Sequence, residues 1–260
     1  MLNKHAWEKP DIVEFYVQDR ELQPPEETIL RICSDRLSEM KMLDIGVGAG
    51  RTTRHFAELA REYVGIDYSE KMIAKCKENL SGFSGNISFF ECDVRSMEMF
   101  DDNEFDLILF SFNGLDYIPH HDRLQALQEI HRIGKPGGFF CFSTHNLHYM
   151  KYMFGLWHQL TWRPRTMLKR LLEWCELSFV HNNPFSIMRM MRGSSHAIFN
   201  DGGHDYSHQT YYIDPTAQIE QLSNHFQDIR IFLSDGCEAK NTELEEIDDW
   251  WIYFLCTIKA

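Results

Sequence analysis

Residues 43–51 read Leu-Asp-Ile-Gly-Val-Gly-Ala-Gly-Arg, and a second apolar run, Tyr63-Val-Gly-Ile-Asp67, follows soon after. This pattern predicts a strand that ends in a glycine loop, a helix after the loop, and a second strand that ends in an acid. Glycines allow a tight turn and a close approach of the backbone to a ligand. The helix start offers free N–H donors, and the acid can accept hydrogen bonds from both hydroxyls of a ribose. The stretch therefore predicts a pocket for a nucleotide-like ligand.

The spacing of the glycines narrows the kind of pocket. A dinucleotide fingerprint reads Gly-x-Gly-x-x-Gly, and counting from Gly46 its third glycine position is occupied by Arg51. The third glycine is Gly50 instead, and Asp44 lies inside the strand before the loop. This [D/E]-x-G-x-G-x-G arrangement resembles motif I of the class I methyltransferases that use S-adenosylmethionine (SAM). The resemblance covers residues 26–146 and 210–260.

Apolar patterning predicts an α/β fold with a mostly parallel sheet. Segments with helical and strand periodicity alternate up to residue 145, which implies right-handed crossovers and helices on both faces of the sheet. We expect strands at 41–46, 63–67, 87–92, 105–112 and 139–144, and helices at 27–37, 50–61, 69–79 and 122–133. Ser69 is the expected N-cap of the third of these helices.

The C-terminal part of the chain breaks the alternation. A helix at 215–225 is followed by strands at 229–234 and 250–258, with no helix between them. Two strands without a crossover helix pair antiparallel. The expected fold is therefore a Rossmann-like three-layer sandwich: a seven-stranded, mostly parallel sheet with an antiparallel terminal hairpin. The resemblance implies the same fold.

Residues 147–209 fit no strand–helix alternation and predict an inserted helical cap over the carboxyl edge of the sheet. Between 147 and 193 there are seven Lys or Arg against two Glu, together with three of the six tryptophans. Three interpretations stay open: a pocket for a hydrophobic or anionic small molecule, a homodimer interface, or a basic amphipathic face toward lipid. The expected domains are a core of 1–146 and 210–260, in which 1–25 form an N-terminal lid helix, and a cap of 147–209.

Composition limits the class of partner and the compartment. The formal net charge of −13 disfavours a nucleic-acid surface, because nonspecific binding to phosphates needs clustered Lys and Arg. Seven cysteines, an odd number without a C-x-x-C pair, favour a reducing compartment. The N-terminus lacks the apolar core of a signal peptide, and no run of about 18 apolar residues predicts a membrane span. We expect a cytoplasmic protein.

The resemblance also implies which residues hold the cofactor. Gly46, Gly48 and Gly50 would pass under the methionine and ribose part of SAM, and Asp44 would either hold this loop or reach the amino group. Asp67 would bind the ribose, unless it caps the next helix. The other implied contacts are Tyr68 and Met72 beside the adenine, Asp93 and Val94 on its edge, Ser111, Phe112 and Asn113 at the methionine part, and Tyr16 from the lid.

Candidate catalytic residues follow the carboxyl ends of strands four and five and the cap. His145 is a candidate general base because an unperturbed histidine has a pKa of about 6.5. Asn113 can hold cofactor or acceptor, and Tyr211 or Tyr212 can face the acceptor where the chain re-enters the core. Asp116 and Tyr117 either face the acceptor or begin a turn. Asn113, His145 and Asn146 are a poor ligand set for Mg²⁺, so no metal is expected.

The leading hypothesis is a SAM-dependent methyltransferase acting on the nitrogen or oxygen of a small molecule by in-line displacement. Methylation of RNA, such as a modified tRNA base, is the alternative substrate class. A SAM-binding module without turnover is the alternative outside enzymes. An NAD-dependent dehydrogenase is disfavoured by Arg51 at the third glycine position.

Overall fold

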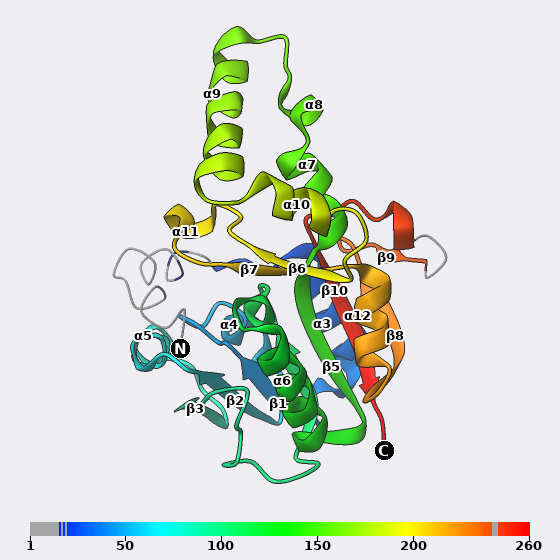
Figure 1. The fold of residues 1–260 in the computed structure, drawn as a ribbon. Helices are drawn as coiled ribbons and strands as arrows, with labels where there is room; N and C mark the ends of the chain where they lie inside the picture. Colours follow the sequence, from blue (N-terminus) through cyan, green and yellow to red (C-terminus); the bar gives the residue numbers. More distant parts are fainter. Residues whose placement is uncertain (1–15, 17, 19, 241–243) are drawn as a thin grey trace.

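In the computed structural model, which describes residues 16, 18, 20–240 and 244–260, ten strands form one sheet (Figure 1). The strand order is β3-β2-β1-β4-β5-β10-β8-β9, and β7 pairs with both β5 and β6. The strands are β1 Lys41–Ile45, β2 Glu62–Asp67, β3 Ile87–Glu91, β4 Phe105–Phe110, β5 Gly134–Asn146, β6 His196–Phe199, β7 Thr210–Ile213, β8 Phe226–Phe232, β9 Glu238–Ala239 and β10 Trp251–Ile258.

Helices cover both faces of this sheet, because neighbouring strand residues point to opposite sides. Leu43 and Ile45 pack with one helical layer, whereas Met42 packs with the other. The first layer consists of α6 (His120–Ile133) and α12 (Pro215–Leu222), and the second of α3 (Pro24–Leu37), α4 (Thr53–Phe56) and α5 (Glu70–Asn79). The three-layer sandwich expected from the sequence is thus confirmed.

The parallel and antiparallel pairings also follow the expectation. Strands β1 to β5 pair in parallel, and β10 pairs antiparallel with both β5 and β8. The seven-stranded core β3-β2-β1-β4-β5-β10-β8 is therefore the predicted one. Strands β6, β7 and β9 are additions to it.

Two helical expectations were wrong in detail. The helix expected at 50–61 is only α4, Thr53–Phe56, and Leu59 is exposed rather than buried. At the start of this helix the hydroxyls of Thr52 and Thr53 bond the side chains of Asp44 and Tyr63. The helical spacing of apolar residues in 27–37 and 122–133 also predicts Ile32 and Leu124 on buried faces, but both lie at the surface. By contrast, Ser69 caps α5 as expected, accepting a hydrogen bond from the backbone N of Met72.

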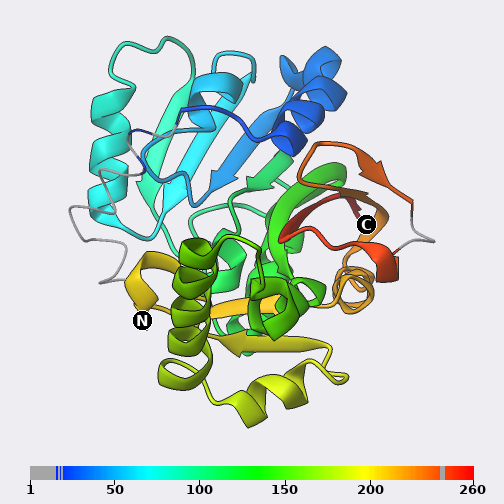
Figure 2. The same cartoon turned by 90° about the horizontal axis from the view of Figure 1, so that it is seen from above.

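The segment 147–209 lies above the carboxyl edge of the sheet, as Figures 1 and 2 show. It contains helices α7 Met150–Phe154, α8 Leu156–Gln159, α9 Pro164–Cys175, α10 Pro184–Met190 and α11 Gly203–Tyr206. It also contains β6, a strand that the sequence did not predict. Strand β5 continues to Asn146, beyond its last pairing with β4 at Phe142. Beyond that point β7 pairs in parallel with β5, and β6 pairs antiparallel with β7.

Most of the expected N-terminal lid, residues 1–15, 17 and 19, lies outside the described residues. Among those described, no helix is long and apolar enough to cross a bilayer.

Candidate cofactor and active site

A cavity of about 330 Å³ opens at the carboxyl edge of the parallel strands. Parallel strands end at the same edge, so the segments after β1, β2, β3 and β4 meet there. Most of the residues expected to hold the cofactor line this cavity: Tyr16, Asp44, Gly46, Gly48, Asp67, Tyr68, Met72, Asp93, Val94, Ser111 and Phe112. Its volume falls within the range of small-molecule pockets, roughly 300–1,000 Å³.

The glycine loop approaches the cavity with its backbone. Gly48 has φ 55° and no atom that a Cβ would strike closely, so its conformation rather than its packing favours glycine. Gly50 has φ 91° and faces the other way, where a Cβ would lie 2.7 Å from Leu80 Cδ1 of the segment after α5. Gly50 therefore packs the loop onto the helical layer and does not line the cavity.

Asp67 ends β2 and ties the loop to the next helix. Its Oδ2 accepts a hydrogen bond from Gly48 N at 3.1 Å, and its Oδ1 accepts one from Ser69 N at 2.8 Å. Ser69, not Asp67, is the N-cap of α5. A carboxylate oxygen has more than one lone pair, so Asp67 keeps acceptor capacity toward the cavity that it lines.

Asp44 holds the loop from inside the strand. Its Oδ2 accepts hydrogen bonds from the hydroxyls of Thr52 and Tyr63. Burial raises the pKa of Asp44 to about 6, and the hydroxyl hydrogen bonds only partly counter this effect. Of its two expected roles, the structure shows the loop-holding one.

The far end of the cavity carries paired charges. Arg95 donates two hydrogen bonds to the Asp93 carboxylate, from Nε to Oδ1 at 2.9 Å and from Nη2 to Oδ2 at 2.7 Å. Its Nη1 donates to Asp122. All three residues line the cavity. The Asp93 carboxylate, expected on the adenine edge, is thus already engaged by a cation that the sequence analysis did not single out.

A buried ion pair flanks the cavity at the glycine loop. Arg51 bonds both carboxylate oxygens of Glu26, with Nη1–Oε2 at 2.5 Å and Nη2–Oε1 at 2.6 Å. The Ser111 hydroxyl also donates to Glu26. Burial by itself raises the pKa of Glu26, but the hydrogen bonds and charge of Arg51 outweigh it and hold the pKa below its usual value. Arg51 lines the cavity, whereas its sequence position only argued against a dinucleotide site.

The turn after β4 has a strained backbone. Phe112 and Asn113 have φ values of 55° and 59°, a region that non-glycine residues rarely adopt. Asn113 N donates to Ser143 Oγ at 2.7 Å, which fixes the turn to β5. The Phe112 ring meets Tyr16 edge-on with centroids 6.0 Å apart, and the Arg51 guanidinium lies 5.0 Å from its centroid. Phe112 and Tyr16 therefore form one wall of the cavity.

His145 sits behind this turn instead of in the cavity. Its Nδ1 lies 2.8 Å from Asp116 Oδ2, and its Nε2 lies 3.3 Å from Asn113 Nδ2. Asp116 is itself bonded by the buried guanidinium of Arg123 at 2.6 Å. Neither His145, Asn113 nor Asp116 is among the residues that line the cavity. The expectation that His145 faces the reaction centre as a base is corrected, because its two ring nitrogens are occupied by Asp116 and Asn113.

Neither re-entry tyrosine reaches the cavity. The Tyr211 hydroxyl lies 2.8 Å from Nδ1 of His120, and the Arg123 guanidinium lies 4.7 Å from its ring centroid. Tyr212 accepts a hydrogen bond from Trp250 Nε1 at 2.7 Å. Burial raises the pKa of both phenols, so both stay protonated. An aromatic residue that does line the cavity is Tyr117, which ends the short 3-10 helix Gly114–Tyr117 after the strained turn.

The described part of 147–209 contributes no lining residue to the cavity. Its expected role as the wall of an acceptor pocket is therefore not met for this cavity. Among the described residues, no group of three or more His, Cys, Asp or Glu side chains is placed to hold a metal ion.

The shape and donors of the cavity fit SAM. A backbone loop with positive φ values, the acid Asp67 at the end of β2, the aromatic residue Tyr68 and the carboxylate of Asp93 all line it. Gly46, Gly48 and Asp67 would hold the ribose and methionine part. The adenine would be surrounded by Tyr68, Met72, Asp93 and Val94. The Asp93 carboxylate would then accept hydrogen bonds from both the adenine and Arg95.

Comparisons with known proteins agree with this geometry. Residues 42–138 match the family described as a methyltransferase domain. The ubiquinone/menaquinone biosynthesis C-methyltransferase UbiE of Pseudomonas paraeruginosa (strain DSM 24068 / PA7) is 36% identical over 103 residues, 38% of this chain and 39% of that protein. The chain spans about two fifths of the length of the curated relatives that it matches.

Solved structures share the fold over a longer span. A SAM-dependent methyltransferase from Mesorhizobium loti aligns with TM-score 0.58 and 18% identity over 90% of this chain and 97% of that one. The 1,6-didemethyltoxoflavin-N1-methyltransferase of Burkholderia thailandensis, with bound 1,6-didemethyltoxoflavin and S-adenosylhomocysteine, aligns with TM-score 0.59 and 14% identity over 99% and 84%. Residues 42–138 thus match the methyltransferase-domain family, and the chain as a whole shares the fold of SAM-dependent methyltransferases of known structure.

Proposed function

We propose that this chain transfers a methyl group from SAM to a nitrogen or oxygen of a small-molecule acceptor by in-line displacement. The observation that carries the proposal is the cavity at the carboxyl edge of the sheet, which the glycine loop, Asp67, Phe112 and Tyr117 line together. The chemistry that bound SAM supplies is an electrophilic methyl group. The protein's task is then to orient the two reactants and exclude water.

The residues around the cavity divide this task. Asp67 and the loop at Gly48 fix the ribose, which positions the reactive end of the cofactor. Phe112, Tyr16 and Tyr117 shield that end from water. Burial raises the pKa of Tyr117 far above its usual value, so its phenol stays neutral and acts as a hydrogen-bond partner. Catalysis in this site rests on proximity rather than on a strong base.

His145 and Asn113 keep a proposed role as positioning residues. Asp116 fixes one nitrogen of the His145 ring, and the other nitrogen lies against the Asn113 amide. Through Asn113, His145 supports the strained turn that carries Phe112. Tyr211 would act indirectly: its ring packs against Arg123, and Arg123 holds Asp116, the partner of His145.

The acceptor side supports a small, partly apolar molecule. Tyr117, Ile118 and Pro119, which follow the strained turn, would line it. The UbiE relative is a C-methyltransferase by name, and the toxoflavin enzyme is an N1-methyltransferase. Carbon therefore joins nitrogen and oxygen among the acceptor atoms to be tested. All seven cysteines are free, which supports a cytoplasmic setting.

The first test is calorimetric titration with SAM, S-adenosylhomocysteine and NADH. We expect the first two to bind and NADH not to bind. Asp67→Ala should weaken binding on the order of 10- to 100-fold, because hydrogen bonds to a charged acceptor are lost. Asp101→Ala, an exposed acid outside the cavity, is the matched control and should bind as the wild type does. A folded protein that binds neither SAM nor S-adenosylhomocysteine would refute the proposal.

Turnover is tested separately. Formation of S-adenosylhomocysteine is followed with panels of nitrogen, oxygen and carbon acceptors. Binding without turnover on any panel supports a SAM-binding module instead. Salt-sensitive capture of tRNA on a filter supports the RNA alternative, because phosphate contacts weaken steeply with salt.

A further inference from the structure

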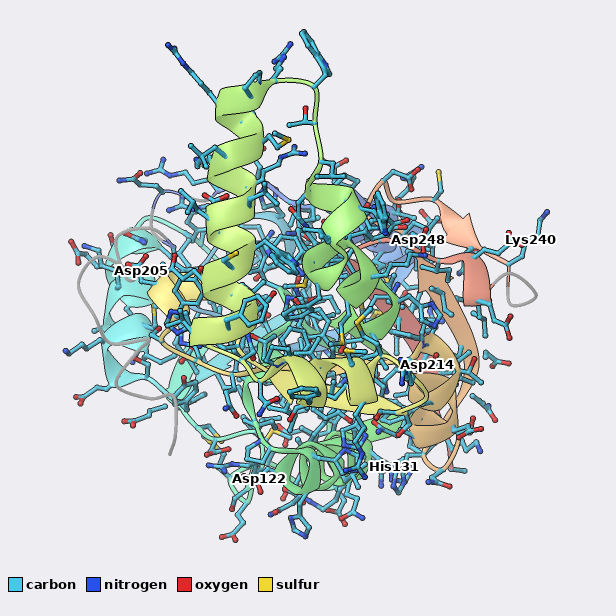
Figure 3. All side chains as sticks on the ribbon, turned by 45° about the horizontal axis from the view of Figure 1, so that its top comes forward. Asp122, His131, Asp205, Asp214, Lys240 and Asp248 are labelled. Carbon is cyan, nitrogen blue, oxygen red and sulfur yellow. The ribbon has the colours of Figure 1, made fainter. Side chains whose placement is uncertain are left out.

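The helical hairpin of α8 and α9 stands out from the body of the protein (Figure 1). The two helices contact each other, and neither contains a buried residue. Figure 3 shows the free end of the hairpin extending beyond the other described side chains, with its own side chains projecting into solvent.

The hairpin presents apolar side chains that nothing in the described chain covers. One side of α9 packs inward: the Trp174 indole donates to Phe154 O at 2.9 Å, and Met167 and Leu171 are half-buried. Other apolar side chains of the hairpin are open to solvent. We call them the tip surface, and they are Trp157 of α8 (83% exposed), Trp162 of the connection (84%), and Leu168 (60%) and Leu172 (62%) of α9.

Positive charge surrounds the tip surface. Residues 156–175 contain Arg163, Arg165, Lys169 and Arg170 but only one acid, Glu173, whereas the whole chain has a formal net charge of −13. The Arg163 guanidinium lies 5.1 Å from the centroid of the Trp162 ring, so a cation and an aromatic side chain lie side by side. The molecule therefore has an acidic body and a basic, aromatic tip.

We propose that the tip surface binds peripherally to a bilayer containing anionic lipids. Helices that lie in a membrane interface combine Lys and Arg on one face with Trp and Leu on the other. Tryptophan favours this zone because its ring is apolar and its N–H is polar. Anionic headgroups attract the tip and repel the acidic body, which fixes the molecule with its hairpin toward the lipid.

Charge favours lipid over a second copy of this chain. In a symmetric dimer the same patch meets itself, so the arginines of one tip would face those of the other, whereas Lys169 is already paired with Glu173. A bilayer with anionic headgroups instead offers negative charge to the cations and an apolar layer to the tryptophans and leucines.

The test is flotation of the full chain with vesicles of phosphatidylcholine alone and with phosphatidylglycerol added. We expect binding only with phosphatidylglycerol, and release as sodium chloride rises from 50 to 500 mM. Arg163→Gln with Arg165→Gln should lower the partition coefficient on the order of 30-fold, given about 1 kcal/mol for each cation near an anionic surface. Trp157→Ser with Trp162→Ser should lower it at least about tenfold.

Matched controls lie on the body. Lys75→Gln with Lys77→Gln removes two charges from α5, and Met99→Gln removes an exposed apolar side chain. Both should bind vesicles as the wild type does, with thermal unfolding by circular dichroism showing that every variant is folded. Wild type that stays unbound on phosphatidylglycerol vesicles at low salt overturns the proposal. So does a concentration-dependent dimer in sedimentation equilibrium that the tip variants abolish while vesicle binding is absent.

Discussion

Glu26 and Arg51 illustrate how a single buried pair supports the cofactor cavity. Glu26 comes from α3 and Arg51 from the loop after β1, so their contact joins the first helix to the glycine loop. The Tyr253 hydroxyl from β10 also lies 3.0 Å from Glu26 Oε1. Breaking a buried pair leaves one uncompensated charge, which costs more than the pair contributes.

Replacing Glu26 by Gln should therefore destabilise the protein strongly. We expect a loss of about 3–5 kcal/mol in the free energy of unfolding, because Arg51 keeps its charge in a dry site. Urea denaturation measures this loss, and Glu27→Gln, an exposed neighbour on the same helix, is the control. Adding Arg51→Met to Glu26→Gln should restore part of the stability. Equal effects of the two Glu→Gln changes would contradict the assignment.

Asp44 predicts a specific pH dependence of stability. Its pKa in the folded state is raised to about 6, above its ordinary value of 3.8, because burial disfavours the charged form. Such a group stabilises the fold fully below the ordinary value, and this contribution is lost as the pH rises toward 6. Asp44→Asn lacks this titration. The stability of the variant relative to the wild type should therefore rise between pH 4 and 6.5.

Thermal unfolding of both proteins across that pH range checks the sign. Asn keeps an oxygen that can accept from Thr52 and Tyr63, so the loop contact is largely retained. A constant difference between the two melting temperatures would show that Asp44 does not titrate in this window.

Residues whose roles lie within one local motif were predictable, and residues joined across the fold were not. Asp67 ends a strand at a set distance from the glycine loop, so its place could be inferred. Glu26 and Arg51 are 25 residues apart and belong to no common motif. His145 follows the strand end where a catalytic residue is expected, but its ring bonds Asp116 and Asn113 and does not line the cavity. The periodicity of the sequence does not indicate these two contacts.

At the scale of elements, the N-cap of α5 links the cofactor loop to the helical layer. Ser69 Oγ accepts from Met72 N at 3.3 Å, and Ser69 N donates to Asp67. Ser69→Ala should cost about 1 kcal/mol, because it leaves a backbone N–H at the helix start without its partner. The melting temperature should fall by about 2–4 °C. Ser81→Ala, at an exposed position just after the helix, is the control and should change it less.

Long periodic elements matched their sequence signals, while short ones depended on contacts from elsewhere. The stripe of α6 and the alternating core of β1 and β4 are local patterns. The start of helix α4 is fixed by hydroxyl bonds from Thr52 and Thr53 to Asp44 and Tyr63, residues of two different strands. Strand β6 forms only because β7 extends the sheet beside the end of β5. Such tertiary causes leave no period in the sequence.

At the scale of the whole molecule, the cavity and the α8–α9 hairpin are separate features. The segments after β1, β2, β3 and β4 line the cavity, whereas no described residue of 147–209 does. The hairpin projects away from the sheet (Figure 1). The cavity thus belongs to the core, and the hairpin is available for another contact.

Hydrogen–deuterium exchange of the full chain with and without S-adenosylhomocysteine tests this separation. Ligand that binds only the folded state stabilises it by mass action, and local protection should appear where backbone lines the cavity. With ligand, we expect slower exchange in 44–52, 67–72, 92–95 and 110–117. In 156–175 we expect the same exchange rates with and without ligand. The Asp67→Ala variant, at the same ligand concentration, should show much weaker protection throughout. Protection that extends over 156–175 would mean that the hairpin closes over the cofactor, and the two features would then act as one.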